Sequence, residues 1–223
     1  MSNSKFNLYE HLGELRKRLI VAGVSIGILS LISFSLSDFL IAVVTAPVGK
    51  HLYHLYFFSP YEAFMTKLKL SLASGVFLSL PVILTQLWQF ISPALFPKEK
   101  KLVLPFTAIS IFLFFLGALF SYFIVIPTTL GFFLGFQAPE LEPLISIGSY
   151  LSFFLSFILI FGIVFVVPVV LVGLVYLRVL KTEFLRCQRK VIVLFIFILA
   201  AVLTPTADVL TQCLLAFPLW GLF

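Results

Sequence analysis

The chain has 223 residues, of which 61% are hydrophobic and 11% are charged, whereas a typical soluble domain carries about 25% charged residues. This composition excludes an ordinary water-soluble globule. The net charge of +6 does not indicate nucleic-acid binding, because the basic residues lie between apolar stretches and do not cluster on one soluble face. We expect an all-α membrane protein whose residues 1–223 form a single domain.

Several stretches without charged residues exceed the roughly 20 residues that span a bilayer core. We predict six transmembrane helices, at residues 19–37, 62–92, 102–126, 150–177, 191–204 and 209–223. The last two would reach only about 21 to 23 Å, so they should thin the bilayer or pack against partners. The chain stops at Phe223 without a charged residue after the last span, and we expect that it is trimmed there.

The basic residues predict the orientation of these helices. Twelve of the 15 lysines and arginines fall before the first helix, between the second and third, or between the fourth and fifth. These segments lie on one side of the membrane, which the positive-inside rule assigns to the cytoplasm. Both termini should therefore be cytoplasmic.

The segment before the first span is amphipathic, with leucines on one helical face and Glu10, Glu14 and Lys17 on another. We expect it to lie in the membrane interface before the chain turns inward. Glu14 can pair with a basic residue three or four positions later, or it can serve as a ligand. Within the span, Gly23 and Gly27 form a spacing that permits close helix packing.

The first outer loop, residues 38–59, mixes polar and aromatic side chains as interfacial segments do. We expect a short element there. Ser59-Pro60-Tyr61-Glu62 has the pattern of a capping box, which predicts a helix start near Pro60. Pro81 should kink this second helix, and Lys67 and Lys69 should extend toward water.

No motif of an enzyme or a cofactor site is present. Gly49-Lys50 lacks the remaining residues of a phosphate-binding loop, and no protease motif occurs. Cys187 and Cys213 lie in different environments without metal-ligand spacing, so we expect neither a disulfide nor a metal site. A small-solute carrier stays an alternative, although carriers commonly show an internal repeat and a mid-membrane polar site.

Two acidic residues stand at cytoplasmic ends of predicted helices. Glu14 precedes the first helix, and Glu99 lies between the second and third, in the first turn after Pro97. An acid in a first helical turn stabilises the helix dipole, which is one explanation for Glu99. The other explanation is that Glu14 and Glu99 together bind a ligand with two guanidinium groups, because each carboxylate can accept the two parallel N–H donors of one guanidinium.

Several strings, in order along nearly the whole chain, resemble the TatC family of the twin-arginine protein translocase. They are residues 11–19 (HLGELRKRL), 46–47 (AP), 59–60 (SP), 81–95 (PVILxQxWxFIxPAL), 161–168 (FGxxFxVP) and 204–218 (TPxxDxxxQxLLAxP), where x marks a position that does not carry the resemblance. Their joint order with six spans makes the resemblance specific.

The resemblance implies a non-enzymatic, oligomeric receptor in the bacterial cytoplasmic (inner) membrane. It would bind twin-arginine signal peptides of folded proteins and recruit partners of the TatA and TatB types, with the proton gradient and no nucleotide driving transport. The signal-peptide site maps onto Glu14 and Glu99, with Arg16, Gln86 and Phe90 at nearby motif positions.

Other family positions map onto the outer loops and the last helices. Thr204 and Gln212 would contact single-span partners, and Ser59, Pro60, Pro47 and Asp208 belong to the outer loops. For Pro47 and Asp208, two explanations stay open. These residues can shape the loop or cap a helix, or they can take a direct part in the function. One position departs from the family, which commonly has glutamate where this chain has Val166.

Overall fold

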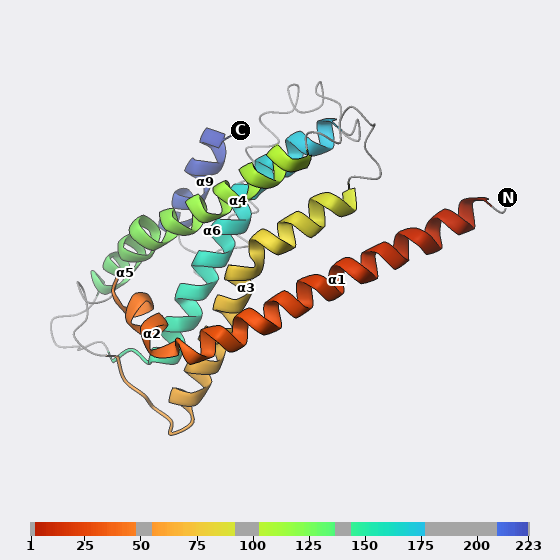
Figure 1. Ribbon diagram of the computed structural model, residues 1–223. Helices are drawn as coiled ribbons and strands as arrows, with labels where there is room; N and C mark the ends of the chain where they lie inside the picture. Colours follow the sequence, from red (N-terminus) through yellow and green to blue (C-terminus); the bar gives the residue numbers. More distant parts are fainter. Residues whose placement is uncertain (1–2, 48–54, 92–102, 137–143, 177–208, 223) are drawn as a thin grey trace.

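The computed structural model describes residues 3–47, 55–91, 103–136, 144–176 and 209–222. This part of the chain is helical (Figure 1) and contains α1 (Asn3–Ser35), α2 (Ser37–Thr45), α3 (Glu62–Ile91), α4 (Val103–Phe120), the π-helix η4 (Ser121–Val125), α5 (Ile126–Leu134), α6 (Ile147–Tyr176) and α9 (Val209–Leu222). A single β-bridge joins Tyr56 to Ser146. The all-α prediction is confirmed for the described residues.

Among the residues that the structure describes, four segments are long and apolar enough to cross a membrane. They are Leu12–Ser35, Glu62–Phe90, Val103–Leu134 and Ile147–Gly173, and they correspond to the first four predicted spans. Helix α9 has 14 residues and is short, as predicted for the last span. The fifth predicted span, 191–204, lies outside the described residues, so six spans and cytoplasmic termini stay predictions.

Helix α1 differs from the prediction at its start. It is one continuous helix of 33 residues, about 50 Å long at 1.5 Å per residue, and it does not turn between the amphipathic segment and the span. The residues around the expected turn, Glu14 to Leu19, are strong helix formers. The helix therefore continues straight from the polar segment into the apolar one.

The third predicted span, 102–126, is too short. The helical path continues through α4, η4 and α5 to Leu134, past Pro127. The backbone N–H of Ile126 bonds to the carbonyl of Ser121, five residues earlier, which widens the turn just ahead of the proline. Such a π-turn inserts one residue into a helix, and here the helix passes a proline that lacks a donor.

Helix α1 packs mainly on α3, with little contact to α2. It runs beside α3 and extends away from the remaining helices (Figure 1). The close approach is at Gly75 of α3, where an added Cβ would lie 2.7 Å from the backbone nitrogen of Ser30. Gly23 and Gly27, expected to serve such packing, have no atom within 4 Å of an added Cβ. That expectation was wrong within this chain.

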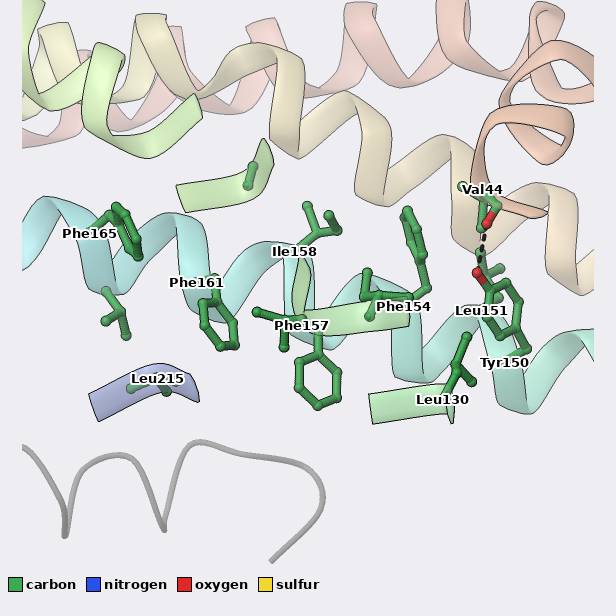
Figure 2. Close-up of a cluster of buried hydrophobic side chains, with 14 of the residues drawn as sticks. Val44, Leu130, Tyr150, Leu151, Phe154, Phe157, Ile158, Phe161, Phe165 and Leu215 are labelled. Carbon is green, nitrogen blue, oxygen red and sulfur yellow. Dashed lines mark hydrogen bonds between the residues drawn. The ribbon is translucent and has the colours of Figure 1, made fainter. Parts of the chain in front are cut away.

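The centre of the fold is α6, whose side chains Phe157 and Phe161 are fully buried. Figure 2 shows this cluster, to which α2 contributes Val44 and α9 contributes Leu215. The carbonyl of Val44 accepts a hydrogen bond from the hydroxyl of Tyr150 at 2.7 Å. Because helix-end carbonyls have no partner within the helix, this bond fixes the end of α2 on α6.

At the α2 end of the molecule, the side chain of Glu62 joins the start of α3 to the start of α6. One carboxylate oxygen accepts the N–H of Phe58 at 2.7 Å, and the other accepts the N–H of Gly148 at 3.1 Å. Glu62 thus reaches back as the capping-box pattern predicted, although α3 begins at Glu62 itself, after Pro60. One acidic side chain satisfies donors at the start of two helices.

The lysines near this end behave differently from each other. Lys67 forms an ion pair of 2.6 Å with Asp38 at the start of α2, instead of only extending toward water. Lys69 is exposed. Helix α3 is bent in Figure 1 and contains Pro81, in agreement with the predicted kink.

The close approach of α1 to α3 predicts a difference between two glycine substitutions. Gly75→Ala should destabilise the protein by about 1 to 3 kcal/mol, because the new methyl group meets backbone atoms of α1 and overpacks the contact. Gly23→Ala is the matched control on α1, where the space is open, and it should leave stability nearly unchanged. Thermal unfolding in detergent measures both, and equal losses would contradict this packing.

Candidate functional site

The predicted acidic residue Glu14 lies on the part of α1 that extends along α3. Its Oε1 accepts hydrogen bonds from the guanidinium of Arg18, one turn later, through Nε at 3.2 Å and through Nη2. The pair is partly exposed, with 18% of the Arg18 side chain and 33% of the Glu14 side chain accessible. The helical pairing weighed for Glu14 in the sequence is therefore present.

The same guanidinium also reaches α3. Its Nη1 donates to the side-chain oxygens of Gln89 at 2.8 Å and of Gln86 at 3.3 Å. The two glutamines are three residues apart and so lie on one face of α3. Arg18 therefore joins two of the predicted site residues, Glu14 and Gln86, in one cluster. We call Glu14, Arg18, Gln86 and Gln89 the guanidinium cluster.

The turn of α3 that carries these glutamines is held by Trp88. The buried indole N–H donates to the hydroxyl of Ser110 on α4 at 3.1 Å, and the ring stacks on Phe106 with centroids 5.2 Å apart. An added Cβ at Gly173 of α6 would lie 2.6 Å from the indole. Three helices thus fix the direction in which Gln86 and Gln89 face.

The other predicted signal-peptide residues are placed differently. Arg16 is exposed and lies two positions from Glu14, so the two side chains do not face each other on the helix. The structure does not bring Arg16 into the guanidinium cluster. Phe90 is half-buried at the end of α3, one residue after Gln89. Glu99 lies outside the described residues.

The predicted partner and outer-loop residues are only partly described. Gln212 is half-buried on α9, whereas Thr204 and Asp208 lie outside the described residues. Pro47 is buried just after α2, and Ser59 and Pro60 precede α3, half-buried and exposed respectively. Pro47, Ser59 and Pro60 therefore each occupy a loop position near a helix end.

Val166, the departure from the family pattern, is 6% exposed and packs in an apolar cluster with Leu84 of α3 and Phe114 of α4. A carboxylate in this environment would be buried without a partner, which is costly. The neighbours of Val166 are therefore consistent with an apolar residue at this position.

Sequence reasoning missed Arg18 and Gln89 as members of the site. Arg18 belongs to a string that carries the resemblance, whereas Gln89 lies at a position that the resemblance leaves open. The motifs could not indicate their contact, because the two residues are 71 positions apart and meet only through the packing of α1 on α3.

Comparisons with known proteins agree with this fold. The family model for the Sec-independent protein translocase protein (TatC) matches residues 10–218. The chain is 40% identical to the Sec-independent protein translocase protein TatC of Carboxydothermus hydrogenoformans, over all of this chain and 92% of the relative. The Aquifex aeolicus protein of the same name is 40% identical, over 97% of this chain and 91% of the relative.

A crystal structure described as the twin arginine translocase receptor TatC superposes with a TM-score of 0.82 at 40% identity and covers 95% of each chain. Together, the long apolar helices and these matches define a non-enzymatic membrane component of a protein translocase. The chain belongs to the TatC family and is part of the Sec-independent, or Tat, transport system, which works with other Tat proteins. This family transports proteins, which decides against a small-solute carrier.

The contacts of Trp88 predict how the glutamine-bearing turn responds to change. Gly173→Ala should displace the indole, lower the unfolding temperature and shift the emission of Trp88 to longer wavelength, measured with Trp220→Phe to leave one tryptophan. Ser110→Ala removes the acceptor of the indole N–H and the hydroxyl's own hydrogen bond to the carbonyl of Phe106, and it should cost about 1 to 3 kcal/mol because the buried indole N–H loses its partner. Unchanged emission and stability in Gly173→Ala would show that the turn is not held in this way.

Proposed function

We propose that this chain is the receptor that binds twin-arginine signal peptides of folded proteins, with Glu14 as one of the groups that hold a peptide guanidinium. The observation that carries this proposal is the guanidinium cluster. Its carboxylate and two amide oxygens already coordinate an arginine side chain. Charge-assisted hydrogen bonds of this kind are stronger than neutral ones, so the cluster has the chemistry that recognition of arginine requires.

Glu99 is the second carboxylate of the proposed site. It belongs to the segment that joins α3 to α4, and the ends of both helices meet at Trp88, which stacks on Phe106. A signal peptide with two guanidinium groups would use Glu14 and Glu99 together. Arg16 and Phe90 would contribute to peptide contacts outside the guanidinium cluster.

The proposed orientation places the guanidinium cluster at the cytoplasmic side of the bacterial inner membrane. Six spans with both termini in the cytoplasm agree with the distribution of basic residues. The α2 end, with Asp38, Lys67 and Glu62, would then face outward. Ser59, Pro60, Pro47 and Asp208 would shape the loops on that outer side.

Partner binding is assigned to the last two helices. Single-span partners of the TatA and TatB types would contact Thr204 and Gln212, because a polar group in lipid gains from a hydrogen bond across helices. The apolar packing of Val166 favours this location over α6. An oligomeric complex driven by the proton gradient completes the proposal, and the whole chain would act as one membrane domain.

Neutralising either carboxylate tests the proposal. Glu14→Gln and Glu99→Gln should each reduce crosslinking to a twin-arginine signal peptide by about tenfold or more, since removing one partner of a charged pair costs about 1.5 to 3 kcal/mol. The measurement uses a photoreactive peptide and membranes that contain equal amounts of each variant.

Asp38→Asn is the matched control, because it removes the same charge at the α2 end of the molecule, where Asp38 pairs with Lys67. Crosslinking should stay at the wild-type level in this variant. If both glutamate variants crosslink as well as the wild type, the proposed site is wrong.

A further inference from the structure

The carboxylate that we assign to signal-peptide binding is already occupied by an arginine of the same chain. All three nitrogens of the Arg18 guanidinium have acceptors. Nε and Nη2 bond to Glu14, and Nη1 bonds to Gln86 and Gln89. Both bonds to Glu14 go to its Oε1, so an incoming guanidinium can take this oxygen together with the two glutamines only if Arg18 leaves.

We propose that Arg18 acts as an internal guanidinium that the ligand must displace, and that it thereby lowers the affinity of the site. This inference rests on the proposed function, because it concerns the same carboxylate. Binding then becomes an exchange of one cation for another at Glu14. The affinity is lowered by the cost of displacing Arg18, and this cost is the same for every ligand that takes its place.

The exchange favours arginine over lysine for a geometric reason. A ligand arginine can remake the contacts that Arg18 gives up, because it presents the same planar fork of donors. A lysine ammonium is a compact point charge and cannot reproduce a set of contacts that extends from Glu14 on α1 to Gln86 and Gln89 on α3. The acceptors of the cluster therefore prefer arginine to lysine, whereas the cost of displacing Arg18 is the same for both ligands.

The position of Arg18 permits its displacement. The pair with Glu14 is partly exposed, and ion pairs of this kind contribute little to stability. The arginine side chain is long and flexible, so it can turn toward the aqueous interface. The close contact between α1 and α3 lies elsewhere, at Ser30 and Gly75, and this contact remains when Arg18 moves.

A purely structural role for Arg18 makes the opposite prediction. If Arg18 only joined α1 to α3, its loss would separate Glu14 from Gln86 and weaken every ligand by a similar factor. If Arg18 competes with the ligand, its loss frees Glu14 for any cation. Both arginine and lysine ligands then bind more tightly, by the same factor.

The experiment compares twin-arginine and twin-lysine versions of one signal peptide on the full chain in lipid nanodiscs. Arg18→Gln should tighten both peptides at least threefold and leave the ratio of their affinities unchanged, because both escape the same cost of displacing Arg18. Lys17→Gln is the matched control, since it removes one charge from the neighbouring, exposed position of α1. It should change both affinities much less than Arg18→Gln does.

Arg18→Lys is a second variant that preserves the charge and tests the same idea if Arg18→Gln does not insert. Lysine is a weaker internal competitor at this position, so this variant should tighten both peptides by less than Arg18→Gln does. The inference is overturned if Arg18→Gln, or Arg18→Lys in its place, weakens the peptides or leaves their affinities at the wild-type values. Failure of the proposed function looks different, because the wild type itself would then bind both peptides equally or Glu14→Gln would bind normally.

Discussion

The close approach of α1 and α3 at Gly75 is the contact on which the proposed site depends. Helix α1 has little other attachment to the molecule, and an added Cβ at Gly75 would meet the backbone of Ser30. Lipid supplies no hydrophobic force between helices, so small residues that permit close packing decide whether two helices associate. This packing places Glu14 and Arg18 opposite Gln86 and Gln89.

Helix α3 connects the two ends of the molecule. At the α2 end, Glu62 binds the start of α6 through the N–H of Gly148. At the other end, Trp88 holds α3 against α4 through Ser110. The same helix thus carries the amide groups of the guanidinium cluster and fixes their position relative to the core around α6.

Much of the fold follows from the sequence because membrane spans are defined by long apolar stretches. The four described spans and the short α9 were predicted for this reason. The prediction for 102–126 failed at Pro127, since a π-turn in η4 lets the helix continue. The choice of Gly23 and Gly27 also failed. Spacing alone shows that a glycine can pack closely, but only the fold shows that Gly75 does.

The candidate site was predictable to a similar extent. The strings that resemble the TatC family indicated Glu14 and Gln86 separately. The shared contact through Arg18 was not predictable, because it depends on the register between two helices that are far apart in the sequence. The occupied state of Glu14, and hence the exchange that we propose, is a property of the packed helices.

A structure of the chain with a bound twin-arginine signal peptide tests the central claim most directly. Our account predicts a peptide guanidinium on the carboxylate of Glu14, within hydrogen-bonding distance of Gln86 or Gln89, and the side chain of Arg18 displaced from that carboxylate. A bound peptide whose arginines lie elsewhere, with Arg18 still on Glu14, would contradict it.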